Sequence, residues 1–193
     1  MKKNVMLWTR AGQIGLAIVR RTGDEMKIIL GGKNFENAQS MASLMNTAGF
    51  DVIPVQMDLA SREDILRFIE TGKQNGPVTK LISAAGVSPS QASVDVILKA
   101  GLFGTAVLLE EVGKIIEEGG CGVHISSQSG FRMPQLTAEE DEQMACTPAE
   151  DLLNLKMLQP ENVKDSLHAY LLAKRCNEKR VMFEAVRWGK REA

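Results

Sequence analysis

The fold is decided by residues Asn4–Gly15, which read NVMLWTRAGQIG. Within this stretch, Asn4–Trp8 is a short apolar run of the kind that forms a buried strand, and Leu16–Arg21 continues with the apolar spacing of a helix. A turn that contains glycine joins the two. Strand, glycine turn and helix therefore follow one another in the order that a dinucleotide-binding βαβ unit requires.

The turn itself carries the first candidate binding residues. In a βαβ unit of this kind, the turn backbone and the free N–H groups at the helix amino end hold a pyrophosphate. Gly12 is expected to let the backbone approach the anion, Gly15 to allow close packing of helix on strand, and Ile14 to contact the cofactor between them. The fingerprint G-x-G-x-x-G has a glycine where Arg10 stands, so we expect Arg10 either to crowd the turn or to reach a phosphate.

A second motif lies near the end of the chain. Tyr170 and Lys174 are four positions apart, so a helix places both on one face. An ammonium beside a phenol favours the ionised phenol, and such a phenol can exchange a proton with a carbonyl or an alcohol. A solvated helix with a chance pairing of these residue types is the alternative interpretation.

Two further segments end in small or hydroxyl residues. Gly122–Gly130 reads GVHISSQSG and predicts a strand that ends in serines, and Leu81–Gly86 reads LISAAG and predicts a strand that ends in alanine and glycine. Ligands bind at the carboxyl ends of strands in open α/β sheets. Both segments are therefore expected at a binding site.

Together these motifs resemble the short-chain dehydrogenase/reductase family, over essentially the whole chain. The resemblance implies hydride transfer between a nicotinamide cofactor and the carbon of a small carbonyl or alcohol substrate. It makes Tyr170 the general acid and base, Lys174 the group that favours the ionised phenol and holds the nicotinamide ribose, and Ser127 the donor to the substrate carbonyl. It also places Ala85 and Gly86 beside the cofactor.

The choice of cofactor is expected to depend on residues that follow the second and third strands. Lys33 stands where a carboxylate would bond the ribose 2′-hydroxyl, and a cation there favours a 2′-phosphate, so we expect NADP rather than NAD, with Arg10 as a second cation. The resemblance places Asp58, followed by Leu59, at the adenine. A solvated lysine and a solvated strand-end carboxylate are the alternative interpretations of Lys33 and Asp58.

Strands alternate with helices along the whole sequence. This predicts the α/β class, with a Rossmann-like, doubly wound parallel sheet in one dinucleotide-binding domain over residues 1–193. The apolar spacing and the terminal residues predict a strand over Asp51–Gln56 and helices over 34–48, 65–73, 98–118 and 166–188.

The segment 131–165 reads as an insertion between the serines and the tyrosine helix. Glu139–Glu142 looks like a solvated charge cluster, and Thr147–Glu150 like a capping box that begins a short helix through Leu155. We expect the segment to form a lid or side wall over the substrate pocket, with a packing or oligomer contact as the alternative.

Two departures from the family pattern leave the function open. Gly101 stands where the family commonly has an asparagine that supports a proton relay, and the chain ends at Ala193, where family members continue through further strands. The resemblance is thus to a C-terminally truncated member with an incomplete sheet. The chain is either an NAD(P)-dependent oxidoreductase that interconverts a carbonyl and a secondary alcohol, or a remnant that binds nucleotide or a partner with little or no turnover.

Composition limits the classes of protein to which the chain can belong. The 193 residues carry a net charge of −1 and are 44% hydrophobic, as expected for one compact domain, and with 5% aromatic residues and no basic stripe they do not suggest nucleic acid. No stretch resembles a signal peptide or a membrane span, so we expect a cytoplasmic protein. Three scattered cysteines predict neither disulfides nor a metal site. The apolar faces of helices 98–118 and 166–188 resemble the family's dimer-forming pair, and a homo-oligomer is expected.

Overall fold

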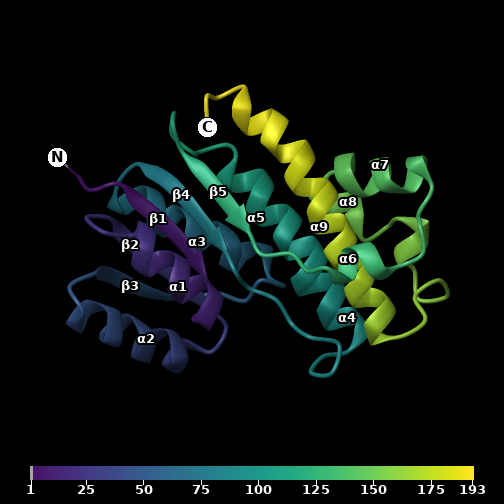
Figure 1. The fold of residues 1–193 in the computed structure, drawn as a ribbon, viewed down its shortest axis with the longest axis horizontal. Coiled ribbons are helices and arrows are strands. Elements are labelled where there is room, and N and C mark those ends of the chain that lie inside the picture. The colour runs from purple at the N-terminus through teal and green to yellow at the C-terminus, as the bar shows by residue number, and fades with distance from the viewer. Residues whose placement is uncertain (1) are drawn as a thin grey trace.

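A computed structural model describes residues 2–193 and contains one five-stranded parallel sheet, in the order β3-β2-β1-β4-β5 (Figure 1). Helices cover both faces, which confirms the expected doubly wound α/β sheet. The strands are β1 (Val5–Thr9), β2 (Lys27–Gly32), β3 (Asp51–Gln56), β4 (Val78–Ser83) and β5 (Cys121–His124).

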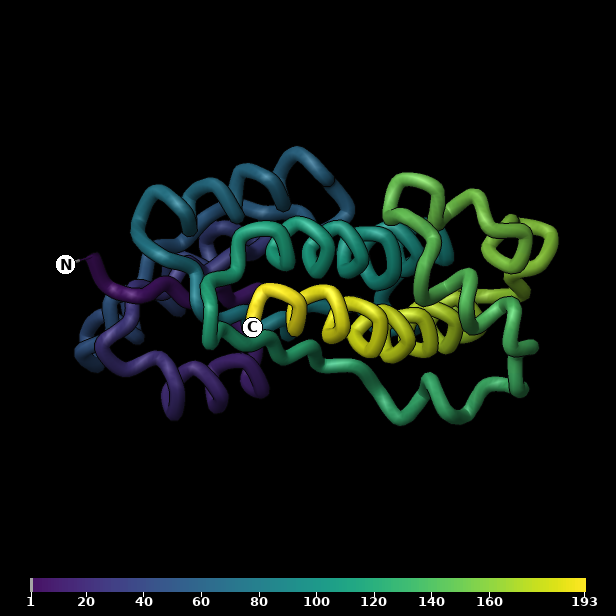
Figure 2. Tube along the Cα trace, turned by 90° about the horizontal axis from the view of Figure 1, so that it is seen from above, coloured from purple at the N-terminus to yellow at the C-terminus, as the bar shows by residue number. Residues whose placement is uncertain are grey.

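The helices divide between the two faces of the sheet, as the edge-on view of Figure 2 shows. One face packs against α1 (Gln13–Thr22) and α2 (Phe35–Thr47). The other packs against α3 (Arg62–Asn75), α5 (Gly104–Val112) and α9 (Ser166–Gly189). The shorter elements are α4 (Val94–Val96), a π-helical segment (Ile97–Phe103), α6 (Ser129–Arg132), α7 (Ala138–Cys146), α8 (Ala149–Leu152) and a 3-10 turn (Lys156–Leu158).

β1 is the central strand, and all five of its residues are buried. Its side chains alternate between the hydrophobic cores on the two faces of the sheet. Leu7 lies in the core on the α3 side and Trp8 in the core on the α1 side. A continuous apolar run is what a parallel strand covered on both faces requires. The opening stretch of the sequence therefore forms the centre of the fold.

The helix expected over 98–118 is wrong in its extent. It begins with a π-helical segment and α5 ends at Val112, with Gly113 at its C-cap. A Cβ on Gly113 would lie 2.3 Å from Nε1 of Trp188. The glycine at the helix end is therefore Gly113, against which the indole of α9 packs, and the Gly119-Gly120 pair follows in a later turn.

The capping box expected at Thr147 is also wrong. The box is formed ten residues earlier, where the Thr137 hydroxyl accepts from the Glu140 N–H at 3.2 Å and the Glu140 carboxylate accepts from the Thr137 N–H at 2.8 Å. Acidic residues also favour the first turn of a helix. Glu139–Glu142 consequently belongs to the start of α7, with Glu139 and Glu142 exposed to solvent as expected, and Thr147 ends that helix.

The segment 131–165 packs against α5 and α9. Met144 of α7 and Leu152 of α8 are fully buried in the core beside α9. Asp141 of α7 pairs with Arg175 at 2.6 Å and with Lys179 at 3.0 Å. α7 and α8 thus cover part of the apolar faces of α5 and α9 that suggested a homo-oligomer. The lid hypothesis stays a prediction.

β5 is shorter than the strand expected over 122–130, since the serines follow it in an extended connection. It is an edge strand: only β4 pairs with it among residues 2–193. Within the same residues, no helix combines the length and the hydropathy that a membrane crossing needs.

Candidate functional site

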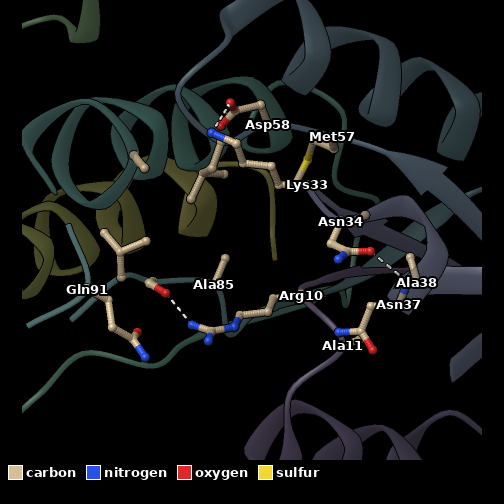
Figure 3. Close-up of a pocket in the computed structure, with 16 residues that line it drawn as sticks. Arg10, Ala11, Lys33, Asn34, Asn37, Ala38, Met57, Asp58, Ala85 and Gln91 are labelled. Carbon is tan, nitrogen blue, oxygen red and sulfur yellow. Dashed lines mark hydrogen bonds and ion pairs between the residues drawn. The ribbon is translucent and has the colours of Figure 1, made fainter. Parts of the chain in front are cut away.

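A crevice lies at the carboxyl ends of the central strands, with a cavity of about 300 Å³ (Figure 3). Its walls come from the β1–α1 turn, the ends of β2 and β3, and the segment after β4. This is the position at which open α/β sheets bind ligands. Among the residues singled out from the sequence, those that line the cavity are Arg10, Lys33, Asp58, Leu59, Ala85 and Gly86.

The β1–α1 turn has the geometry of a pyrophosphate site. Gly12 is the N-cap of α1 and supplies no capping side chain, so the first N–H groups of the helix remain available to an anion. A Cβ on Gly15 would lie 2.3 Å from Nε1 of Trp8, so only glycine permits the observed approach of α1 to β1. Ile14 is 60% exposed on the outer side of the first turn. The turn therefore leaves backbone donors free at the amino end of α1.

Arg10 occupies the position of the missing glycine and has a left-handed backbone, with φ of 66°. The turn therefore needs the conformation that glycine adopts most readily. The guanidinium of Arg10 crosses the crevice and donates a hydrogen bond to the carbonyl oxygen of Gly86 (Figure 3). The side chain thus connects two walls of the cavity and brings a cation into it.

Lys33 and Asp58 form an ion pair of 2.7 Å at the opposite wall (Figure 3). Burial by itself would raise the pKa of Asp58, but the Lys33 ammonium and the Ala60 N–H together hold that pKa below its ordinary value. The Asp58 carboxylate is therefore charged at neutral pH. Lys33 remains 73% exposed and carries its ammonium at the mouth of the crevice.

The Thr9 side chain holds one wall of the crevice in place. Its hydroxyl oxygen, fully buried at the end of β1, accepts hydrogen bonds from the N–H groups of Ala84 at 3.0 Å and Ala85 at 3.1 Å. The segment that leads to Gly86 is thereby held against the end of β1.

Lys174 projects from α9 toward the same end of the sheet. Its ammonium is buried, donates to the Ile125 carbonyl at 3.1 Å and lies 5.7 Å from the centre of the Tyr170 ring. A Cβ on Gly86 would lie 3.7 Å from the same nitrogen, so Lys174 reaches the wall of the crevice. Burial lowers the pKa of Lys174, because the charged form loses hydration.

The serines after β5 approach α9 at this point. Ser126 donates its hydroxyl to the Lys174 carbonyl at 3.1 Å, and the Ser127 hydroxyl oxygen accepts from the Ser129 N–H at 3.1 Å. α6, which begins two residues after Ser127, packs directly on α9. Because its oxygen is the accepting atom, Ser127 keeps its own proton available for a ligand.

The two histidines of the chain and Gly101 lie outside the lining of the crevice. His124 bonds Ser83 across the β4–β5 pair at 3.0 Å, and burial, with a smaller contribution from the Lys174 cation, lowers the pKa of His124 to about 3. His168 accepts from the Lys164 N–H at 3.2 Å, in the loop before α9. Gly101 lies within the π-helical segment, where its Cα faces Ala173 of α9.

Sequence reasoning missed several residues that line the crevice. Asn34 and Asn37 follow β2, and Asn34 also caps α2 by accepting from the Asn37 N–H at 2.9 Å. Their position just past a strand end was the available signal, because that end faces the ligand. Gln91 lies in the irregular connection after β4, which carries no periodic pattern that could have indicated it.

Comparison with known proteins agrees with this geometry. The family model described as short chain dehydrogenase matches residues 3–138. The chain is 31% identical, over 194 aligned residues, to the short-chain dehydrogenase/reductase bsc3 of Alternaria brassicicola, and the alignment covers all of this chain and 70% of that protein. The chain therefore belongs to the short-chain dehydrogenase/reductase family, and this membership supports an oxidoreductase role with a nicotinamide cofactor.

Solved structures share the fold. A short-chain dehydrogenase/reductase from Serratia marcescens BCRC 10948 superposes with a TM-score of 0.70 at 19% identity, over 98% of this chain and 70% of that one. A blue fluorescent protein from a metagenomic library, solved in complex with NADPH, gives a TM-score of 0.59 at 20% identity, over 68% of this chain and 59% of that one. This chain thus spans between 59% and 70% of the length of the relatives named here.

Proposed function

We propose that this protein binds NADP in the crevice and interconverts a small carbonyl compound and a secondary alcohol. One observation carries the proposal: the Lys174 ammonium lies beside both the Tyr170 ring and Gly86 of the crevice wall. The same ammonium is therefore close to a proton donor and to the cofactor pocket. When bound, the nicotinamide supplies or accepts the hydride.

The chain's own residues divide the remaining tasks. Tyr170 exchanges the proton of the alcohol oxygen, and Lys174, whose ammonium lies 5.7 Å from the centre of the Tyr170 ring, holds the nicotinamide ribose. Ser127 donates its hydroxyl proton to the substrate oxygen and so fixes the orientation of the carbonyl. Gly12, with the free N–H groups of α1, holds the pyrophosphate, while Ala85 and Gly86 line one wall of the pocket.

The preference for NADP over NAD is proposed from the charges at the two walls. Arg10 and Lys33 are cations on opposite sides of the cavity. Arg10 donates a hydrogen bond to the neutral Gly86 carbonyl, and Lys33 pairs with the Asp58 carboxylate. A ribose 2′-phosphate offers both of them a charge-assisted hydrogen bond. NADPH in a protein with the same fold agrees with this choice.

A second candidate is a remnant that retains nucleotide binding but has little turnover. Two features favour it: Arg10 spans the crevice, and Gly101 has no side chain to support a proton relay beside α9. Binding and turnover are therefore to be measured separately.

The experiment compares the wild-type chain with Tyr170→Phe. Cofactor binding is followed by titration of NADPH and NADH fluorescence, and turnover by cofactor absorbance over a panel of ketones, aldehydes and secondary alcohols. We expect wild-type turnover to fall by about a hundredfold or more in Tyr170→Phe with unchanged NADPH affinity, since only the proton transfer is lost. Saturable binding without any wild-type turnover would instead favour the remnant, and tighter binding of NADH would reject the NADP preference.

A further inference from the structure

The Asp58 carboxylate is held in place by the backbone around it. Its Oδ1 accepts a hydrogen bond from the Ala60 N–H at 3.0 Å, and the Ser61 N–H donates to the Asp58 carbonyl at 3.0 Å. The Asp58 N–H donates in turn to Oδ2 of Asp64, in the first turn of α3, at 2.9 Å. Because side chain, N–H and carbonyl are all bonded, the carboxylate has a fixed position in the wall of the crevice.

Lys33 is the mobile member of the ion pair with Asp58. It follows β2, its side chain is 73% exposed, and its ammonium reaches Oδ2 of the carboxylate at 2.7 Å (Figure 3). Among residues 2–193, this is the one ion pair that Lys33 makes. A long, exposed lysine side chain has many accessible rotamers, so its resting position depends on the partner that holds it. Asp58 therefore decides where the Lys33 ammonium lies before a ligand arrives.

The two cations of the cavity differ in what a ligand phosphate must displace. Arg10 donates to the neutral carbonyl oxygen of Gly86, whereas Lys33 pairs with a carboxylate that is charged at neutral pH. A phosphate that binds Arg10 competes with a carbonyl dipole. A phosphate that binds Lys33 competes with a full negative charge and is also repelled by it. The wall formed by Lys33 and Asp58 therefore attracts an anion less strongly than its lysine alone would.

We propose that Asp58 is a positioning residue that limits the preference of the crevice for NADP over NAD, because it holds the ammonium of Lys33 away from the ribose 2′-phosphate. The inference rests on the proposed function, in which Lys33 engages that phosphate. NAD carries a hydroxyl in place of the phosphate, so its binding neither requires the ammonium nor meets the repulsion. The Asp58 charge thus changes the relative affinity for the two cofactors and leaves the affinity for NAD nearly unaltered.

The test is the pair of dissociation constants for NADPH and NADH, measured by fluorescence titration of the wild type and Asp58→Asn. Asparagine keeps a side-chain oxygen that can accept from the Ala60 N–H, so the variant removes the charge and retains the local turn. We expect NADPH to bind about fivefold more tightly to Asp58→Asn, the change that release from one partly exposed ion pair produces. The affinity for NADH should stay within about twofold of the wild-type value.

Two further variants separate the contact with Lys33 from other effects of charge. Glu36→Gln is the matched control, because it removes the same charge from an exposed site in the first turn of α2 that does not line the cavity. Its affinities for both cofactors should stay within about twofold of the wild-type values, since solvent and salt screen an exposed charge. In a Lys33→Met background, Asp58→Asn should tighten NADPH binding by about twofold or less, because no ammonium remains to be released.

Several results would overturn the inference while leaving the proposed function intact. Equal weakening of NADPH and NADH by Asp58→Asn would mean that the carboxylate contacts a part of the cofactor common to both, such as the adenine. An unchanged ratio of the two affinities would show that the charge does not affect the choice. A fivefold effect that persists in the Lys33→Met background would mean that Asp58 acts by direct repulsion and not through Lys33. Failure of the wild type to bind either cofactor would instead reject the proposed function, and this inference with it.

Discussion

At the scale of single residues, Arg10 carries the most information, because it fills a backbone position that favours glycine and also places a cation in the crevice. The sequence predicted both consequences, crowding of the turn and contact with a phosphate, but not which one prevails. A left-handed φ and a hydrogen bond to Gly86 are compatible with either.

Arg10→Gly separates these two roles. If the guanidinium binds the ribose 2′-phosphate, the variant should bind NADPH about tenfold more weakly and leave NADH affinity nearly unchanged, since one charge-assisted hydrogen bond is lost. Fluorescence titration measures both constants, and Arg10→Lys, which retains the cation, is the control. Tighter NADPH binding by Arg10→Gly would mean that the arginine obstructs the turn.

His124 predicts a pH dependence of folding. The unfolded imidazole takes up a proton near pH 6.5, whereas the folded one does so only near pH 3. The contribution of neutral His124 to stability is therefore complete above pH 6.5 and is lost as the pH falls toward 3, by up to about 1.4 kcal/mol per pH unit.

Urea unfolding of the wild type and His124→Asn between these pH values measures this contribution. Carboxylates titrate in both proteins, so the difference between the two curves isolates the imidazole. We expect the wild type to lose stability more steeply on acidification than His124→Asn. Parallel curves would contradict a buried neutral His124.

At the scale of elements, the alternating pattern was sufficient for the sheet and for the helices that flank it. The strand Asp51–Gln56 has the expected bounds, and α3, capped by Ser61, contains the whole of the helix expected over 65–73. The errors had a tertiary and a local source. At Gly113 the indole of Trp188, from a distant helix, packs against the end of α5, and local sequence does not reveal this contact; α7 was overlooked because its acidic first turn has the composition of a solvated loop.

Asp141 is expected to anchor α7 to α9. Its carboxylate accepts hydrogen bonds from Arg175 at 2.9 and 2.6 Å. Arg175 has the largest effect on the pKa of Asp141 and lowers it. Burial raises this pKa and Lys179 lowers it, and the pKa remains below its ordinary value. Asp141→Asn should lower the free energy of unfolding by about 1 kcal/mol at neutral pH. The loss should be smaller at pH values below the ordinary carboxyl range, because the aspartate is then protonated in the unfolded chain.

Chemical unfolding measures that cost, with Glu142→Gln as the control. Glu142 is the exposed neighbour on the same helix and loses the same charge, so its variant should stay within about 0.5 kcal/mol of the wild type. Equal effects of the two substitutions would indicate a general charge effect and not the contact with Arg175.

At the scale of the whole molecule, the sequence predicted the sheet and the strand ends that meet at the crevice, because both depend on local periodicity and on the geometry of parallel strands. It did not predict what covers the outer faces of α5 and α9. That depends on how α7 and α8 return to the core, which has no local signature. Arg180 is an example: it is 1% exposed, and it donates to the Ala145 and Thr147 carbonyls at the end of α7.

Replacing residues 139–159 by a short glycine-serine linker tests whether this segment is a lid or part of the core. We expect the thermal stability to fall by a large amount and the deletion chain to aggregate, because the deletion removes buried Met144, Leu152 and Leu158 and leaves Arg180 without its two carbonyl partners. Thermal melting with light scattering measures the effect. A deletion chain that melts like the wild type but accepts different substrates would identify a lid.

The hydroxyl of Thr9 determines how the crevice can open. Since one buried oxygen accepts from both Ala84 and Ala85, the wall that leads to Gly86 cannot move away from the end of β1 without breaking two hydrogen bonds. This side of the crevice is therefore preorganised, and a ligand that binds against it does not have to order it.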